Sequence, residues 1–213
     1  MRTATPVALA CLAVSTLALA GAQDAGAPAR FAPAFDMAGL DMQAGMQAQM
    51  DSMTPGEHHE LLKYFAGDWD VEMEMTSPMM GQKVTSKGET SCEMILGGRF
   101  LHASGTLDFP GMGPSESVAI MGFDTFANRY DLTMISTMNN ATYRATGMPN
   151  QDGTAIVFYG PMDEPMLNFR QRAVRYTYRL IDENSYRVEI DDLAIADPAT
   201  ERVLTITYTR KDD

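Results

Sequence analysis

This 213-residue chain has three histidines, whose side chains can gain or lose a proton near neutral pH. His58 and His59 are adjacent in a segment with helical spacing, so their side chains point about 100° apart and chelate one ion poorly. We expect both on a solvated helix face. His102 is predicted on a strand, as a hydrogen-bonded structural histidine or as a general base. An enzyme of unknown reaction, pairing His102 with Asp124 or Asp108, is therefore one open hypothesis.

Two arginines near residue 170 are the strongest indication of a binding site. Arg170 and Arg172 alternate onto the same predicted strand face as Val174. An inward arginine needs a carboxylate or a ligand anion, because a buried unpaired charge is costly, and its guanidinium can hold a carboxylate through two hydrogen bonds. The alternative is a bulge or bend that turns both side chains to solvent or pairs them with Asp163 or Glu164.

Sulfur is the unusual feature of the composition, with 18 methionines and two cysteines. Cys92 is predicted on an inward strand face as unreactive packing, because no cation is obviously close enough to favour its thiolate. Clustered thioethers suit Cu(I), so copper handling is a third hypothesis, although methionines also fill irregular cores and adaptable ligand surfaces. The clusters are Met42, Met46, Met50 and Met53, then Met73 and Met75, then Met79 and Met80.

A short helix followed by a series of strands must position these residues. The sequence Thr54-Pro55-Gly56-Glu57 is a capping box with proline at the first helical position. Leu61, Leu62 and Phe65 give the helix an apolar face, and Gly67 ends it. After Gly67 the apolar period changes from helical to two, which is typical of strands with one buried and one solvated face.

Segments with this alternation recur to the end of the chain, and turn sequences rich in glycine, proline, asparagine and aspartate separate them. We count about ten strands with short connections, which exclude the long crossovers that parallel strands need. Ten such strands either close into a barrel or split into two sheets. We therefore predict an all-β fold: an antiparallel up-and-down β-barrel of about ten strands with one short N-terminal capping helix.

The first 53 residues differ from the rest. Residues 1–22 are predicted to be a signal peptide, because Arg2 precedes an apolar run that is too short to span a bilayer and ends in small residues suited to cleavage. An uncleaved anchor is the alternative. Residues 23–53 are predicted to be a disordered linker rich in methionine and alanine, in which the methionine spacing suggests a marginal helix. Residues 54–213 are predicted to form a single β-barrel domain.

Charge and cysteine usage exclude several classes of partner. The formal net charge is −12, and it becomes −13 when Arg2 is removed with the signal peptide. Such a chain is repelled by nucleic acid and by anionic membrane surfaces, and no later segment is apolar and long enough to span a membrane. The mature chain keeps one cysteine, Cys92, and so cannot form an internal disulfide. No cofactor motif is present, and the sequence does not define the oligomeric state.

Five short motifs occur in an order that resembles the bacterial domain of unknown function family 1579, over roughly residues 55–211. They are Gly67-Asp68-Trp69, Leu96-Gly97-Gly98-Arg99-Phe100-Leu101, Gly122-Phe123-Asp124, Gly160-Pro161-Met162-Asp163-Glu164-Pro165 and Tyr208-Thr209-Arg210-Lys211. The resemblance implies a calycin-like barrel and carries no established activity. The family often has a tryptophan and an aspartate where this chain has Met134 and Ser136.

The leading hypothesis is a periplasmic or secreted barrel that binds a small apolar or amphipathic molecule in a methionine-lined interior. Arginine and histidine side chains would orient a polar group of this ligand. The predicted ligand-binding residues are Arg170, Arg172, His102, Trp69, Met134 and Tyr143. No metal ligand is assigned.

Overall fold

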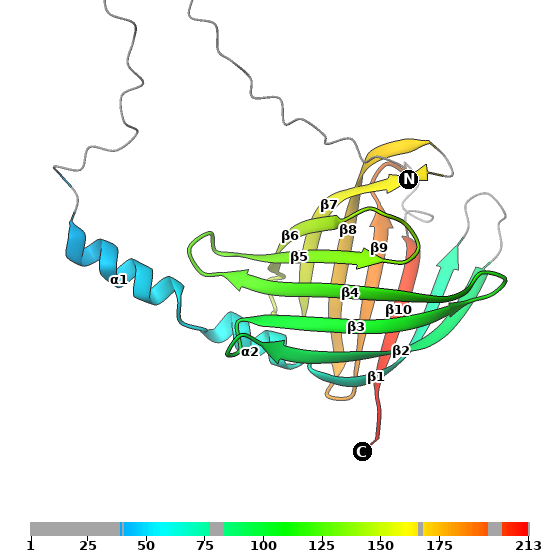
Figure 1. Ribbon diagram of the computed structural model, residues 1–213, viewed down its shortest axis with the longest axis horizontal. Helices are drawn as coiled ribbons and strands as arrows, with labels where there is room; N and C mark the ends of the chain where they lie inside the picture. The colour runs from blue at the N-terminus through cyan, green and yellow to red at the C-terminus, as the bar shows by residue number, and fades with distance from the viewer. Residues whose placement is uncertain (1–38, 40, 77–82, 166–167, 196–201, 213) are drawn as a thin grey trace, which may run out of the picture. The chain divides into compact units, whose positions relative to one another are not determined.

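The computed structural model describes residues 39, 41–76, 83–165, 168–195 and 202–212. These residues form two helices and ten strands (Figure 1). In chain order the elements are α1 (Met42–Ser52), α2 (Glu57–Lys63), β1 (Gly67–Thr76), β2 (Lys83–Ile95), β3 (Phe100–Phe109), β4 (Gly113–Asp124), β5 (Arg129–Ser136), β6 (Tyr143–Pro149), β7 (Ala155–Glu164), β8 (Phe169–Asp182), β9 (Ser185–Asp192) and β10 (Arg202–Arg210).

The strands form one closed barrel (Figure 1). Each strand pairs antiparallel with its neighbours in the sequence, and β1 closes the ring by pairing with both β2 and β10. The predicted up-and-down antiparallel barrel is therefore confirmed. Closure pairs the strand edges that an open sheet would leave exposed, and it encloses an interior that only inward-facing side chains can fill.

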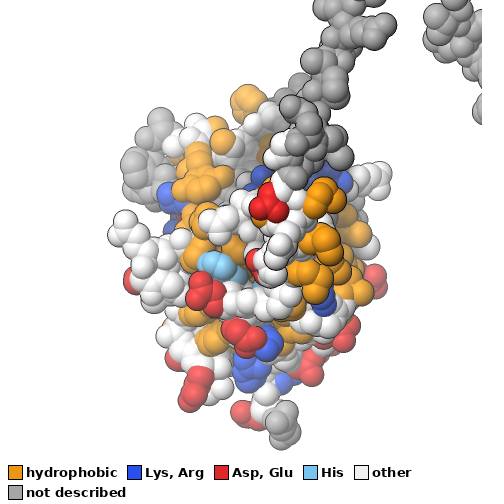
Figure 2. Space-filling model, turned by 90° about the vertical axis from the view of Figure 1, so that its left-hand side faces the viewer, with side chains coloured by type: hydrophobic (Ala, Val, Ile, Leu, Met, Phe, Trp, Pro, Cys, Tyr) orange, Lys and Arg blue, Asp and Glu red, His pale blue; other side chains and the backbone are white. Residues whose placement is uncertain are grey.

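Period-two alternation decides which side chains enter the barrel. On β1, Trp69, Val71 and Met73 are buried, whereas Asp68 and Asp70 are exposed. The other strands follow this alternation in large part, so most apolar side chains gather inside, whereas Asp191 and Asp192 on β9 are buried charged exceptions. On the face shown in Figure 2, hydrophobic side chains are interrupted by acidic and basic ones.

Helix α2 covers one end of the barrel, as the sequence predicts for a capping helix. Leu62 and Phe65 are 0% and 1% exposed, and they pack into the same core as the strand residues. The predicted start of the helix is wrong by two residues, because Gly56 is the N-cap and the Thr54 hydroxyl donates to the Met50 carbonyl instead. The N-cap contact comes from His59, whose Nδ1 accepts the Gly56 N–H at 3.0 Å.

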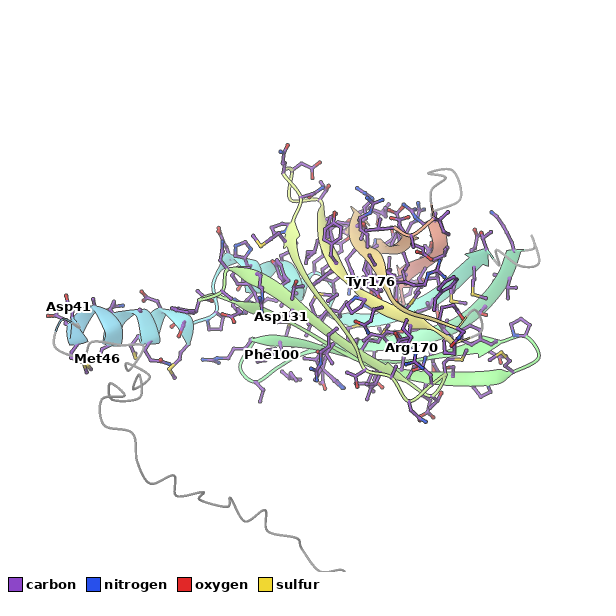
Figure 3. All side chains as sticks on the ribbon, turned by 90° about the horizontal axis from the view of Figure 1, so that it is seen from above. Asp41, Met46, Phe100, Asp131, Arg170 and Tyr176 are labelled. Atoms are coloured by element: carbon purple, nitrogen blue, oxygen red, sulfur yellow. The ribbon has the colours of Figure 1, made fainter. Side chains whose placement is uncertain are left out.

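Helix α1 lies in the segment predicted to be a linker. Its methionine spacing corresponds to an observed helix, which has no buried residue. Met42, Met46 and Met50 are 66%, 68% and 62% exposed, and Met46 is labelled in Figure 3. The predicted signal peptide and residues 23–38 lie outside the described residues. No helix within the described part of the chain is long and apolar enough to cross a membrane.

Candidate functional site

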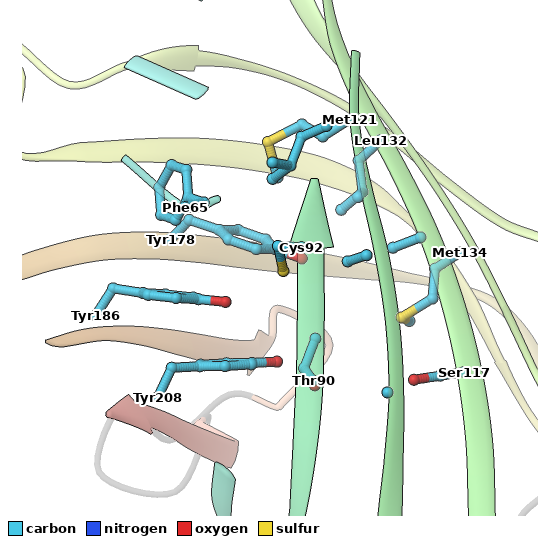
Figure 4. Close-up of a pocket in the computed structure, with 14 residues that line it drawn as sticks. Phe65, Thr90, Cys92, Ser117, Met121, Leu132, Met134, Tyr178, Tyr186 and Tyr208 are labelled. Carbon is cyan, nitrogen blue, oxygen red and sulfur yellow. The ribbon is translucent and has the colours of Figure 1, made fainter. Parts of the chain in front are cut away.

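A cavity of about 70 Å³ lies inside the barrel (Figure 4). Residues of β2, β3, β4 and β5 form one side of it, and residues of β8, β9 and β10 form the other. None of its lining side chains carries a formal charge. They are Phe65, Thr90, Cys92, Leu101, Ala103, Gly105, Ser117, Ala119, Met121, Leu132, Met134, Tyr178, Tyr186 and Tyr208.

Three tyrosines form one wall of the cavity. Tyr178, Tyr186 and Tyr208 occupy inward positions on the last three strands, where alternation places apolar side chains. Tyr208 is the cross-strand partner of Tyr186, and their rings stack with centroids 4.2 Å apart and planes inclined by 8°. The Tyr186 and Tyr208 hydroxyls point in the same direction, toward the strand that carries Cys92 and Thr90 (Figure 4).

Small side chains form the central part of the opposite wall. Ala103 faces Ala119 across the β3–β4 ladder, and Gly105 faces Ser117. A Cβ atom on Gly105 would lie 2.3 Å from Thr90 Oγ1, so glycine is needed here for the threonine hydroxyl to occupy its place. The cavity exists because two cross-strand pairs of small residues lie opposite three tyrosines. The tyrosine rings have a fixed length and do not extend far enough to contact these small residues.

Burial keeps the polar groups of the cavity in their neutral forms. It raises the pKa of the Cys92 thiol to about 11, against a weaker opposing effect of the hydrogen bond that the thiol shares with the Tyr186 hydroxyl. Burial also raises the pKa values of Tyr178, Tyr186 and Tyr208 well above the usual tyrosine range. At physiological pH the cavity therefore contains a thiol and phenols, with no thiolate or phenolate nucleophile.

Trp69, a predicted ligand-binding residue, packs in the barrel core and outside the cavity lining. It is 0% exposed, and its indole N–H donates to the Phe65 carbonyl at 3.0 Å. The Arg210 guanidinium lies 4.2 Å from the Trp69 ring and donates to the carbonyls of Ala66 and Tyr64. These contacts tie the end of α2 to β1 and β10, and Trp69 does not line the cavity.

The predicted solvated face for His58 and His59 is wrong. His59 is 4% exposed and caps α2, and burial lowers its pKa, with smaller contributions from His58 and Arg99. The His58 ring stacks on Phe123 with centroids 3.9 Å apart, and the Tyr130 hydroxyl donates to the His58 carbonyl at 3.0 Å. A helix this short rests on the barrel end with more than one face, which helical spacing alone does not reveal.

Arg172 faces inward, as predicted, and its partner is a carboxylate of the protein. It forms an ion pair with Asp192 on β9, and the two side chains are 15% and 3% exposed. Arg170 is exposed near the start of β8 (Figure 3), because Gln171 has a positive φ of 56° and the ladder to β7 shifts register there. Asp163 accepts the Gln171 N–H at 2.8 Å in this bulge. Neither arginine lines the cavity.

His102 pairs with neither Asp108 nor Asp124, and the carboxylate near it is that of Glu93. His102 lies on the outer face of β3, with its Nδ1 3.7 Å from Glu93 Oε1 on the neighbouring strand. Asp108 lies opposite Lys87, and the Asp124 carboxylate accepts the Ala127 N–H in the β4–β5 turn. Alternation along β3 turns His102 outward because its neighbours Leu101 and Ala103 line the cavity.

Met134 and Tyr143 are cross-strand partners on β5 and β6, but they differ in their relation to the cavity. Met134 lines the cavity, where it contributes apolar surface. The Tyr143 hydroxyl instead accepts a hydrogen bond from the Asn139 side-chain amide and is not part of the lining. Of the six predicted ligand-binding residues, the structure therefore brings only Met134 to the cavity.

The described methionines of the predicted clusters differ in burial. Met73 is 2% exposed inside the barrel, whereas Met46 and Met50 are 68% and 62% exposed on α1. Met79 and Met80 lie outside the described residues. Methionines thus serve as barrel core at Met73 and as exposed helix surface on α1.

Sequence reasoning missed the residues that supply the polar part of the cavity: Tyr186, Tyr208, Thr90 and Ser117. The available signal was the alternation itself, which places Tyr178 and Tyr208 on the inward faces of two predicted strands. The register that brings these strands together was missing, because local periodicity does not determine which strands are neighbours across a barrel.

The described strands form a closed antiparallel meander with one end covered by α2. The chain belongs to the family described as "Protein of unknown function (DUF1579)", whose model matches residues 54–210. None of the curated proteins matches this sequence. The family assignment agrees with the resemblance carried by the sequence motifs.

One solved structure supports the fold, and two others are more distantly similar. Rv2717c from M. tuberculosis is similar with a TM-score of 0.54 and 15% identity, covering 75% of this chain and 100% of that one. The S-type phycobiliprotein lyase CPES from Guillardia theta has a TM-score of 0.45 and 11% identity, covering 78% and 98% of the two chains. A redesigned β-barrel has a TM-score of 0.36 and 12% identity, covering 71% and 96%. At 15% identity, the likeness to Rv2717c shows the fold alone.

Proposed function

We propose that this chain is an exported binding protein that holds a small, largely apolar molecule inside its barrel. The observation that carries the proposal is the cavity of about 70 Å³, which combines apolar walls with the hydroxyls of tyrosine, serine and threonine. Concave, mostly apolar sites with a few convergent polar groups are the usual form of small-molecule sites. The nearby core is closely packed, so the small residues Ala103, Gly105 and Ala119 maintain a specific opening in it.

Binding fits this cavity better than catalysis does. A general acid or base works best with a pKa near the operating pH, and among the described residues no aspartate, glutamate, histidine or lysine lines the cavity. The Cys92 thiol is held protonated, with a pKa of about 11, so it is a poor nucleophile. A binding site needs only shape and complementary polar groups, and the lining supplies both.

The binding proposal is tested on the mature protein purified from the compartment where it accumulates. Native mass spectra before and after organic extraction should show a discrete mass excess that extraction removes. Ala119→Leu fills the cavity and should abolish this excess, because Ala119 lines it. Val118→Leu is the matched control, since Val118 is the adjacent residue on the outer face of β4 and should leave the excess intact.

Two results would contradict the proposal. A bare polypeptide mass across several growth conditions would remove the bound molecule on which it depends. A mass excess that persists unchanged in Ala119→Leu would place the bound molecule outside the barrel. Circular dichroism of both variants establishes that the barrel is folded before the spectra are compared.

Export forms the second part of the proposal, and the N-terminal sequence supports it. Residues 1–22 combine a positive residue, a short apolar run and two small-x-small cleavage patterns, Ala18-Leu19-Ala20 and Ala20-Gly21-Ala22. Expression of the full chain in a bacterium should yield a periplasmic or secreted product whose N-terminus is Gly21 or Gln23. A cytoplasmic product that retains Met1 would contradict export while leaving the binding proposal intact.

A further inference from the structure

Two phenol hydroxyls face the cavity without a hydrogen-bonding partner among the described residues. Tyr186 shares a hydrogen bond with Cys92, whereas Tyr178 and Tyr208 have ring contacts and burial but no hydrogen bond from their hydroxyls. Both residues line the cavity. A hydroxyl removed from bulk water destabilises the fold unless it gains a partner, so these two donors are placed to meet a group inside the cavity.

The cavity offers nothing to balance a charge. None of its lining residues is ionised at physiological pH, since burial keeps Cys92 and the tyrosines protonated. The inward-facing Arg172 is already neutralised by Asp192. An anion or cation that entered would lose its hydration without gaining a counter-charge, so the lining selects against charged molecules.

The volume limits the size of the ligand. A space of about 70 Å³ is well below the several hundred that drug-sized ligands occupy. Because one water needs about 10–15 Å³ on this measure, the cavity holds roughly five to seven water-sized groups. Phenol hydroxyls lie on the tyrosine side, and the opposite side combines the hydroxyls of Thr90 and Ser117 with apolar side chains such as Ala103, Ala119 and Met134.

From these observations we propose that the ligand is a neutral molecule of about five to seven non-hydrogen atoms with one hydrogen-bond-accepting oxygen or nitrogen. The acceptor lies against Tyr178 and Tyr208, and an apolar body lies against Ala103 and Ala119. The inference rests on the proposed function, because it names the ligand class of the same cavity. It replaces the carboxylate-holding arginine site that the sequence suggests.

Three probes of matched heavy-atom count test the ligand class on the mature chain: cyclohexanone, methylcyclohexane and pentanoate. Affinities are measured by calorimetry and by NMR of the methionine methyl groups, since Met121 and Met134 line the cavity. Cyclohexanone should bind best, methylcyclohexane more weakly, and pentanoate should leave the methyl signals unmoved.

Hydroxyl deletion identifies the hydrogen bonds. Tyr178→Phe and Tyr208→Phe should each weaken cyclohexanone binding about threefold to tenfold and leave methylcyclohexane binding unchanged, because only a hydrogen bond is removed. Tyr159→Phe is the matched control, since Tyr159 is 54% exposed on β7 and should change neither affinity.

Each contrary result has a distinct meaning. Equal binding of the two uncharged probes, unaffected by hydroxyl deletion, would overturn the acceptor requirement, and preferential binding of pentanoate would overturn neutrality. If no probe binds while the co-purifying mass persists and disappears in Ala119→Leu, the ligand class is wrong and the binding function stands. If that mass is also absent, the binding function itself fails.

Discussion

The barrel interior contains a packed region and a region with a cavity, although the same alternation of inward and outward side chains governs both. Near α2, Trp69, Tyr130 and Phe158 are fully buried, and none of them lines the cavity. The Tyr130 ring meets the Phe158 ring edge to face, and the Trp69 ring meets Tyr186 in the same way. Around the cavity, rings of similar size face alanine, glycine and serine. Hydrophobic periodicity decides that a side chain points inward, whereas the summed volume of facing side chains decides whether the interior is filled.

The two regions also treat polar groups differently. In the packed region the Trp69 indole and the Tyr130 hydroxyl each donate to a backbone carbonyl. In the cavity the hydroxyls of Tyr178 and Tyr208 have no such partner among the described residues. Buried polar groups that are satisfied by the protein stabilise a structure, and those left facing a cavity are available to a ligand.

The largest expected effect on stability comes from a substitution that creates a cavity in the packed region. Trp69→Ala removes a fully buried ring and its contacts with Tyr186 and Arg210, so the free energy of unfolding should fall by about 3–5 kcal/mol. Urea denaturation measures the change. Ile120→Ala, at a side chain that is 41% exposed on the outer face, should cost much less, and equal losses would contradict the contrast between interior and surface.

An intermediate effect is expected at the N-cap of α2. His59→Ala removes the acceptor of the Gly56 N–H, which should lower the free energy of unfolding by about 1–2 kcal/mol above pH 6.5. Burial lowers the pKa of His59 from 6.5, against a smaller opposing effect of Glu60, so the folded protein prefers neutral His59. Its contribution is present above pH 6.5 and is lost as the pH falls toward the lowered pKa.

The pH dependence has its own control. Urea denaturation on either side of pH 6.5 should show a stability loss at low pH that His59→Ala reduces. His102→Ala should retain this loss, because His102 is half-buried on the outer face and does not cap a helix. An unchanged pH dependence in His59→Ala would show that other groups carry it.

The smallest effects are expected when a single tyrosine hydroxyl is removed from each of the two regions. Tyr130→Phe should lower the free energy of unfolding by about 1 kcal/mol, because the His58 carbonyl loses its donor. Tyr208→Phe, in protein freed of ligand by extraction, should leave the free energy of unfolding unchanged or raise it, since no protein hydrogen bond is broken and a buried hydroxyl without a partner is removed. Chemical denaturation of both variants measures the difference, and a larger loss in Tyr208→Phe would mean that its hydroxyl has a structural partner.

Much of the fold was predictable because it depends on local patterns. The alternation on β1 placed Trp69, Val71 and Met73 inside, and the short connections implied antiparallel neighbours. The candidate site was much less predictable. Of the predicted ligand-binding residues, only Met134 lines the cavity. Arg172 forms an ion pair with Asp192, which is twenty residues away in the sequence. Such partners depend on strand register, which local periodicity leaves open.

The sequence by itself determined the acidic charge, the period-two strands, the helix before them and the family, since each of these is a property of composition or of neighbouring residues. Only the tertiary structure decided that Ala103 faces Ala119 while Tyr186 stacks on Tyr208, and that His59 is buried as a cap. The reason is physical. A cavity is the difference between an enclosed volume and the side chains that enter it, and closure brings those side chains together from strands far apart in the chain.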